Sequence, residues 1–138
     1  MQLSSFTDYS IRVLLYLSTV NGDQLVSIAD ISHYFKISKN HLVKVVYNLS
    51  KLGYVETKQG KNGGIKLKIE KKQINIGTVV RQIEPLNLLN CSLSFCHISP
   101  ACRLKYYLSD AKEAFLKELE KYTIEDIVDP NIQLTNFN

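Results

Sequence analysis

Residues 27–69 read SIADISHYFKISKNHLVKVVYNLSKLGYVETKQGKNGGIKLKI. Within this segment, Ser27 and Ser38 each stand just before apolar residues at helical spacing, where a serine hydroxyl can accept a hydrogen bond from the free N–H groups of a helix start. Only a tight turn at residues 36–37 separates the two helices, and the second is expected to end near Gly53. Two short capped helices joined in this way predict a helix-turn-helix.

A change of sequence period after the second helix predicts a β-hairpin. Residues 54–57 and 64–69 alternate with a period of two, and the Gly-rich, basic residues 59–63 lie between them. Gly63 and Gly64 indicate a turn that needs positive φ. A helix-turn-helix followed directly by a hairpin is the order of a winged helix, and the combination is more specific than either part.

Three further helices are expected outside this segment. A buried helix should span residues 5–20, and a short one capped by Asn75 should end at Pro85. From about residue 100 to 122, apolar residues recur every three or four positions, so this helix would be about 33 Å long at 1.5 Å per residue. Its apolar stripe exceeds what its own domain can cover, which favours a second copy as its partner, with docking on the winged helix as the alternative.

The expected fold class is therefore mainly α with a small β-hairpin: a winged helix-turn-helix plus a long C-terminal dimerisation helix. Charge is divided unequally along this chain. Residues 1–72 contain 11 Lys and Arg against 5 Asp and Glu, whereas residues 73–138 contain 6 against 8. The positive half suits a polyanion such as DNA, although a solvated lysine-rich face would have the same composition.

The N-terminal end of the second helix of a helix-turn-helix meets base edges in the major groove. Asn suits adenine and Lys suits guanine in that groove, while basic residues on a wing suit phosphates or a narrow minor groove. Helix capping and hydration are the alternative roles. The expected DNA contacts are Ser38, Lys39, Asn40, His41 and Lys44 on the helix and Lys61, Asn62 and Lys66 on the wing, with Tyr47, Lys51 and Lys58 along the flank.

All three cysteines, Cys91, Cys96 and Cys102, lie in one short segment. An odd number does not fit a purely disulfide framework, whereas thiolates gathered in this way supply most of the ligands of a soft metal or an iron–sulfur cluster. The segment has neither the paired C-x2-C of ordinary zinc sites nor the four cysteines of a plant-type ferredoxin. A chance cluster of three thiols is the other interpretation.

Five segments form a wider pattern: FTDY at 6–9, KNHLVK at 39–44, GKNGGI at 60–65, EPL at 84–86 and NCSLSFCHISPACRLK at 90–105. They resemble the winged-helix iron–sulfur transcriptional repressors that include IscR and NsrR, over nearly the whole chain, and most closely the nitric-oxide-sensing NsrR branch. The resemblance implies a homodimer with crossing long helices. It also implies one cluster per subunit, held by the three cysteines, and binding to palindromic operator DNA that nitric oxide abolishes.

The resemblance also suggests a fourth cluster ligand. In one NsrR subgroup an aspartate from the other subunit reaches the cluster, and Asp8 stands in the matching position. Asp8 could instead pair with Arg12, four residues along the same helix; His97, water or a small thiol are the rival ligands. Where the IscR branch has a histidine ligand this chain has Lys105, a poor iron ligand, so IscR-type cluster chemistry is disfavoured. Both [4Fe-4S] and [2Fe-2S] clusters remain open.

The resemblance divides the chain into residues 1–84, a DNA-binding winged helix-turn-helix, residues 85–103, a cluster-binding loop, and residues 104–138, the dimerisation helix and tail. A zinc- or thiol-redox-controlled regulator, with His97 completing a zinc site, is the alternative function. No nucleotide-binding glycine pattern or nucleophile–base pair is present, so an enzyme is not expected. No apolar run reaches the about 20 residues of a membrane span and no signal peptide is recognisable, so we expect a cytoplasmic protein.

Overall fold

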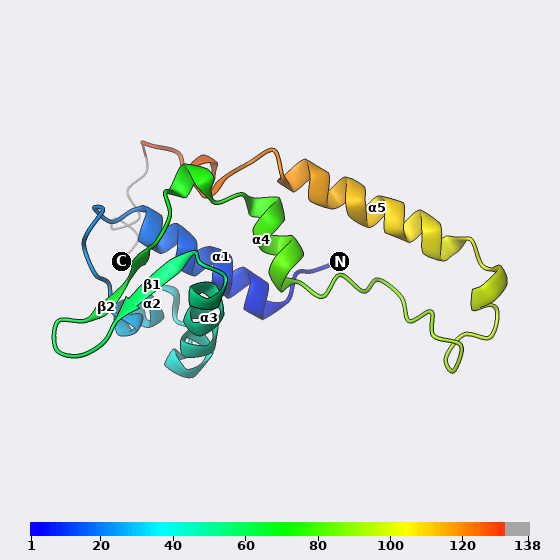
Figure 1. Ribbon diagram of the computed structural model, residues 1–138, viewed down its shortest axis with the longest axis horizontal. Coiled ribbons are helices and arrows are strands. Elements are labelled where there is room, and N and C mark those ends of the chain that lie inside the picture. Colours follow the sequence, from blue (N-terminus) through cyan, green and yellow to red (C-terminus); the bar gives the residue numbers. More distant parts are fainter. Residues whose placement is uncertain (132–138) are drawn as a thin grey trace.

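The computed structural model describes residues 1–131 of the chain (Figure 1). The end of the tail expected from the sequence, residues 132–138, lies outside the described part. Within residues 1–131, no helix is long and apolar enough to cross a membrane. The helices are α1 (Ser5–Ser18), α2 (Ile28–Phe35), α3 (Lys39–Lys51), α4 (Ile76–Ile83) and α5 (Leu104–Leu119), the strands are β1 (Val55–Lys58) and β2 (Gly64–Leu67), and three short 3-10 helices are η1 (Lys71–Gln73), η2 (Ser99–Ala101) and η3 (Ile124–Asp126).

The predicted helix-turn-helix is confirmed, with its caps. The Ser27 hydroxyl accepts a hydrogen bond from the backbone N–H of Asp30 at 3.1 Å, and the Ser38 hydroxyl accepts one from the N–H of His41 at 3.3 Å. Lys36 ends α2 in the left-handed conformation, with a φ of 56°. These local interactions fix where α2 and α3 begin, as their sequence indicated.

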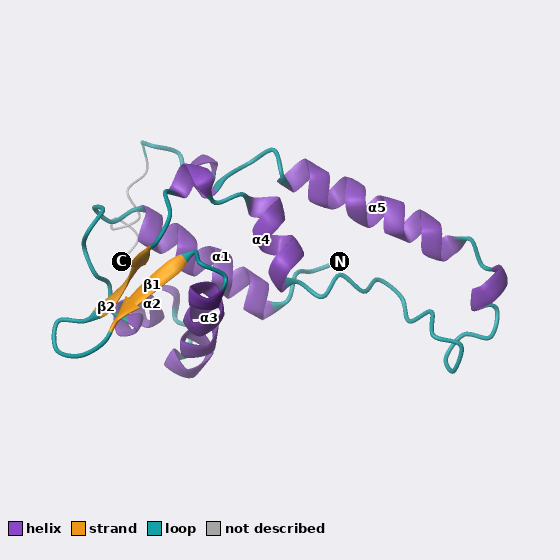
Figure 2. Ribbon diagram, in the orientation of Figure 1, coloured by secondary structure: helices purple, strands orange, loops and turns teal. Residues whose placement is uncertain are grey.

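The hydrophobic core lies between α1, the helix-turn-helix and the hairpin. Apolar residues at helical spacing on α1 and α3 are fully buried, because each helix turns one face inward. Figure 2 shows both strands lying against these helices. The buried core residues include Val13, Leu14 and Leu17 of α1, Ile31 of α2, Leu42, Val45, Val46 and Leu49 of α3, Val55 and Ile65 of the hairpin, and Val79 of α4.

The hairpin is antiparallel, pairs Val55 with Leu67 and Lys58 with Gly64, and is shorter than predicted. The interpretation of Gly63 was wrong, because positive φ at the tip belongs to Gly60 and Asn62 and, at the start of β2, to Gly64. A Cβ on Gly63 would lie 2.1 Å from the carbonyl oxygen of Lys58. Close backbone approach, rather than positive φ, therefore requires glycine at this position.

The predicted length of the C-terminal helix was also wrong. α5 has 16 residues, about 24 Å at 1.5 Å per residue. Extended backbone at Cys102, with a φ of −84° and a ψ of 123°, separates α5 from η2. At the other end, the Asn75 side-chain amide donates to the carbonyl of Glu120 at 2.6 Å, and the N–H of Ile76 donates to Tyr122 at 3.0 Å. The start of α4 thus captures carbonyls that a longer α5 would use internally.

The end of α5 packs closely on α4 at Gly77. A Cβ there would lie 2.4 Å from Cγ of Glu120, so only glycine permits this approach. Beside it, the Arg81 guanidinium lies 3.1 Å from the Glu113 carboxylate and 3.0 Å from that of Glu120. From this junction the rest of α5 extends away from the winged helix, so the cysteines lie at the far end of the molecule from the hairpin (Figure 1).

Candidate nucleic-acid interface and cysteine loop

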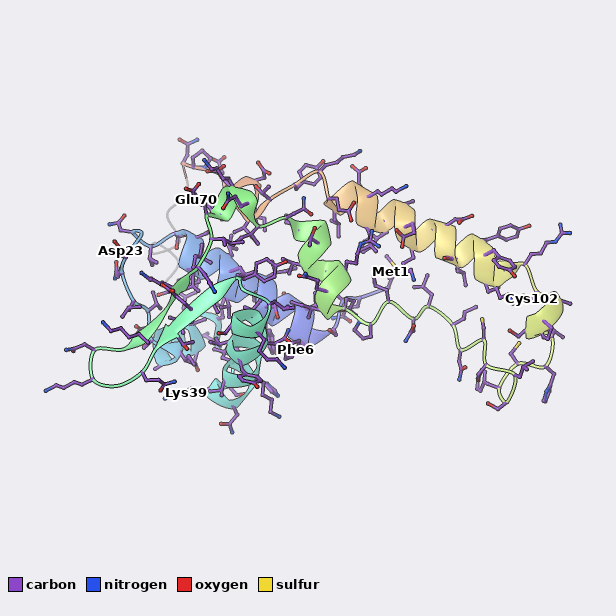
Figure 3. All side chains as sticks on the ribbon, viewed as in Figure 1. Met1, Phe6, Asp23, Lys39, Glu70 and Cys102 are labelled. Atoms are coloured by element: carbon purple, nitrogen blue, oxygen red, sulfur yellow. The ribbon has the colours of Figure 1, made fainter. Side chains whose placement is uncertain are left out.

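The outer face of α3 is polar and exposed over most of its length. Its inner residues belong to the core, so the N-terminal residues Lys39, Asn40 and His41 project into solvent together with Lys44. Ser38 is exposed too, but its hydroxyl is engaged in the helix cap. Figure 3 shows Lys39 at the end of α3 that follows the turn from α2. The structure therefore presents as one surface the helix residues that the sequence selected for DNA contacts.

The wing presents Lys61 and Asn62 at its exposed tip, as predicted. Lys66 differs, because its ammonium lies 3.2 Å from the carboxylate of Asp23 and 3.2 Å from that of Glu56. Hydrogen bonds to these two carboxylates raise the pKa of Lys66 above its ordinary value. The charge of Lys66 is thus compensated within the fold, which makes it a weaker candidate for DNA contact than Lys61.

Two ring interactions border the α3 surface. The ring of His41 lies against that of Tyr9 on α1, with centroids 6.0 Å apart, which limits the orientations of the imidazole. The ammonium of Lys51 lies over the ring of Tyr47 at 5.3 Å from its centroid, and Tyr47 itself is 66% exposed. Tyr47 and Lys51 thus lie on the exposed flank of α3 where the sequence placed backbone contacts.

The cysteine loop, residues 85–103, connects α4 to α5 and is closed by contacts to Ser99. The Ser99 hydroxyl donates to the carbonyl of Cys91 at 2.6 Å, and its own carbonyl accepts from the N–H of Cys102 at 3.3 Å. The same carbonyl accepts from the Lys105 ammonium at 3.0 Å. Ser99 therefore links the segments of the first and third cysteines to the first turn of α5, and Lys105 has a structural role there.

The three thiols are free and half-buried. Their donor chemistry fits an iron–sulfur cluster or another soft metal, because three sulfur ligands lie in one short loop. In residues 1–131 of a single chain, however, no three His, Cys, Asp or Glu side chains are grouped closely enough to hold a metal ion. A complete ligand shell therefore needs a rearranged loop and at least one further donor.

The rival fourth ligands lie in different places. His97 is exposed on the loop itself. Asp8 lies on α1, and its carboxylate is 2.9 Å from the guanidinium of Arg12, so the pairing considered as the alternative is present. Cys102 lies at the distal end of the molecule, whereas Phe6, near Asp8 in sequence, lies in the winged helix (Figure 3). Within one chain, the structure does not bring Asp8 to the cysteines.

The cysteine arm, residues 85–119, exposes many apolar side chains. Leu116 is the one fully buried apolar residue among these residues, all of which are described. A groove of about 570 Å³ separates α5 from the N-terminal residues and the first loop residues, and Leu3, Leu86, Phe115 and Leu119 line it. The large exposed apolar residues of the arm are Leu88, Leu89, Leu93, Phe95 and Ile98 in the loop and Leu104, Tyr106 and Tyr107 in α5.

A polar contact that the sequence did not reveal joins α1 to the start of the arm. The Glu84 carboxylate accepts from the backbone N–H of Ser4 at 3.0 Å and from its hydroxyl at 2.8 Å. Partial burial of this carboxylate raises its pKa, but hydrogen bonds from the buried Thr7 and from Ser4 outweigh burial and hold the pKa below its ordinary value. The segment EPL at residues 84–86 belonged to the sequence pattern, but the pattern did not predict that Glu84 contacts Ser4, 80 residues away.

Comparison with known proteins gives a consistent result. Residues 3–130 match the family model Rrf2, described as an iron-dependent transcriptional regulator. The fold is similar to that of T. potens IscR, with 22% sequence identity, a TM-score of 0.71, and coverage of 92% of this chain and 85% of that one. It is also similar to CymR (YrzC), the global cysteine regulator of B. subtilis, with 24% identity, a TM-score of 0.70, and coverage of 92% and 95%. S. aureus CymR is 21% identical, with a TM-score of 0.71 and coverage of 91% and 99%.

Proposed function

Because the chain belongs to the Rrf2 family of transcriptional regulators, we propose that it is a nitric-oxide-sensitive repressor that binds palindromic operator DNA as a homodimer under the control of an iron–sulfur cluster. Regulators of this family bind DNA and are dimeric. The observation that carries the finer proposal is the loop of three free thiols that leads directly into α5. Regulators, and not enzymes, are the class that the family match supports.

The α3 surface supports DNA binding through charge and side-chain chemistry. Asn40 can form two hydrogen bonds to adenine and Lys44 can donate to guanine, so both would contribute to sequence recognition. Lys61 at the tip of the wing would contact phosphates, which strengthens binding to every sequence. In a two-fold symmetric dimer, two such surfaces would meet half-sites about one helical turn apart, about 34 Å.

The cysteine arm supports control of this dimer by a bound group. Cys91, Cys96 and Cys102 would hold an iron–sulfur cluster, which supplies iron that reacts with nitric oxide, and Asp8 of the other subunit is the proposed fourth ligand. Ligation by the three cysteines would order the loop and fix the direction of α5, because Ser99 and Lys105 tie the loop to the first turn of that helix. The spacing of the two α3 surfaces would then depend on the state of the loop.

The decisive experiment compares protein purified without oxygen before and after excess nitric oxide. We expect a brown protein with iron and sulfide in stoichiometric amounts, and operator binding in a gel-shift or anisotropy assay that is lost after treatment. Equal operator affinity in the two states would contradict the proposed sensor. Equal binding of operator and scrambled duplexes at moderate salt would contradict sequence-specific DNA binding altogether.

A zinc- or thiol-redox-controlled regulator is the second candidate. One observation favours the thiol-redox form of this candidate over its zinc form: among residues 1–131, the three cysteines do not converge with other donors on a metal position. CymR, with a similar fold, is named a global cysteine regulator. A colourless protein whose operator affinity responds to zinc chelation or to a thiol oxidant, and not to nitric oxide, would select this candidate.

A further inference from the structure

α3 carries one exposed side chain that neither the core nor the expected polar DNA contacts explain. Val43 is 53% exposed, whereas Val45 and Val46 on the inner face of the same helix are buried. Among the residues of α3, all of which are described, Val43 is the one purely hydrocarbon side chain that is exposed. Valine is also a weak helix former, so helix propensity does not account for its presence.

The position of Val43 on α3 places it among the residues expected to meet bases. Residues three and four apart share a helix face, so Val43 lies beside Asn40 and Tyr47, and Lys44 follows it. Asn40, Lys44 and Tyr47 are all exposed on this face. Any duplex that brings Asn40 to a base edge must therefore also bring the methyl groups of Val43 into the same groove.

The major groove offers one apolar feature to such a side chain. Adenine, guanine and cytosine present hydrogen-bond donors or acceptors there, whereas thymine also presents its C5-methyl group. We propose that Val43 is a specificity-determining residue that reads the methyl group of a thymine in each half-site. This inference rests on the proposed DNA-binding function and adds a recognised base to it.

The geometry of the helix limits where that thymine lies. Val43 is three residues from Asn40, about 4.5 Å along the helix axis. Successive base pairs are about 3.4 Å apart along the duplex. The thymine is therefore expected one or two base pairs from the base that Asn40 contacts, and the pair of residues favours a half-site rich in A·T pairs.

The test measures the coupling between the valine and the thymine methyl. The full-length chain, purified without oxygen, selects its preferred sites from a pool of random duplexes. Each thymine of the selected half-site is then replaced singly by deoxyuridine, which removes only the methyl group. Affinities for every duplex are measured for the wild type, Val43→Ala and, as a conservative control, Val43→Ile. Thermal unfolding followed by circular dichroism checks that the variants are folded. We expect them to fold like the wild type, because Val43 is exposed.

Each half-site should contain one thymine at which the wild type is sensitive to the methyl group. Replacing that thymine by deoxyuridine in one half-site should weaken binding about 4-fold relative to the unmodified duplex, as expected for one buried methyl group. Replacement in both half-sites of a symmetric dimer should weaken binding about 16-fold. Val43→Ala should be insensitive to that replacement, and Val43→Ile should retain the sensitivity. At all other thymines, the three proteins should respond alike.

Two outcomes would overturn the inference, and they differ from each other. If a defined site is selected but no thymine responds differently in the wild type and Val43→Ala, Val43 does not read a methyl group although the protein is a specific DNA binder. If no sequence is selected over scrambled duplex, both the proposed function and this inference fail.

Discussion

The winged helix and the cysteine arm differ in what covers their apolar side chains. In residues 1–84 the apolar faces of four helices and a hairpin cover one another, with Leu14, Leu42 and Ile31 fully buried. In the arm, Leu116 alone among the apolar residues is fully buried, and Phe95 is 72% exposed. The winged helix thus buries most of its apolar side chains within the chain, with Ile124 of η3 added to its core, whereas the arm would need a bound group or a second chain to bury a comparable surface.

The two regions meet where the end of α5 packs on α4. Arg81 of α4 pairs with the carboxylates of Glu113 in α5 and of Glu120 just after α5. Gly77 allows the side chain of Glu120 to approach α4 closely. Glu84, the last residue before the arm, is held by Ser4 at the start of α1. These residues are the route within one chain by which a change in the arm would reach the proposed DNA-binding surface.

The largest expected effect follows from charging the groove face of α5. Phe115→Asp combined with Leu119→Asp should give a folded monomer, because two charges would be buried across a symmetric contact. Operator affinity should fall about 100- to 10,000-fold, since each half-site loses its tethered neighbour. Sedimentation and operator titration measure both effects. Lys117→Asp, on an exposed position of the same helix, is the control and should remain a dimer. A double variant that sediments as a dimer would exclude this face as the interface.

A smaller effect is expected from removing one thiol. Cys96→Ala should abolish iron and sulfide binding and lower operator affinity about 5- to 150-fold, the usual range of coupling between two sites. The melting temperature of the winged helix should hardly change, because Cys96 lies outside its core. Ser94→Ala, two residues away, is the control and should retain the cluster.

Cys91→Ala and Cys102→Ala should match Cys96→Ala, while Asp8→Ala should keep a more labile cluster. If a variant without the cluster bound the operator as tightly as the wild type does, the proposed control of DNA binding by the arm would be contradicted.

The junction between the regions provides the third test. Gly77→Ala would place a methyl group 2.4 Å from the Glu120 side chain and 2.6 Å from its backbone nitrogen, so the end of α5 must move. Overpacking of this kind should lower the free energy of unfolding by about 1–3 kcal/mol, measured by urea titration. Gly22→Ala is the matched control, since no atom lies within 4 Å of its added Cβ. Equal stability of the two variants would show that α5 is not held at Gly77.

Local features of the winged helix could be predicted from the sequence, because their causes lie within a few residues. Ser27, Ser38 and Asn75 each accept from the backbone N–H three positions later, and this spacing is visible in the sequence. The end of α5 could not be predicted, because the Asn75 side chain captures the carbonyl of Glu120 across 45 residues. Apolar periodicity continues beyond that point, but the backbone N–H groups of Lys121 and Tyr122 donate to carbonyls three residues earlier instead of four.

The residues of the candidate sites also fall into two groups: those whose features have a cause nearby in the sequence, and those whose partner lies far away in the sequence. The three cysteines could be selected as candidate ligands because they are clustered in the sequence, and the exposed end of α3 followed from its cap. Lys66 was selected as a DNA contact because only its charge and wing position were visible, whereas its partner Asp23 lies 43 residues away. The clamp on Glu84 spans 80 residues and was missed for the same reason. Val43 could have been selected as an apolar residue on the polar face of α3.

The smallest expected effect concerns Glu84, where the two regions meet. Its carboxylate is stabilised by hydrogen bonds from Ser4 and Thr7, which lower its pKa in the folded protein. A lowered pKa means that the folded state binds this proton more weakly than the unfolded state, so the stabilisation is complete above the unfolded pKa and is lost as the pH falls through the folded value. The loss should therefore occur below about pH 4.3, the ordinary pKa of glutamate.

Glu84→Gln should lower the free energy of unfolding at pH 7 by no more than about 1 kcal/mol, because the site is partly solvent-screened and the amide oxygen can still accept a hydrogen bond. The difference from the wild type should shrink as the pH is lowered, since the protonated carboxyl resembles the amide. Urea titrations between pH 7 and pH 3 measure this difference, with Glu125→Gln, an exposed glutamate beyond α5, as the control. A difference that stays constant over this range would mean that packing of the side chain, and not its charge, joins α1 to the arm.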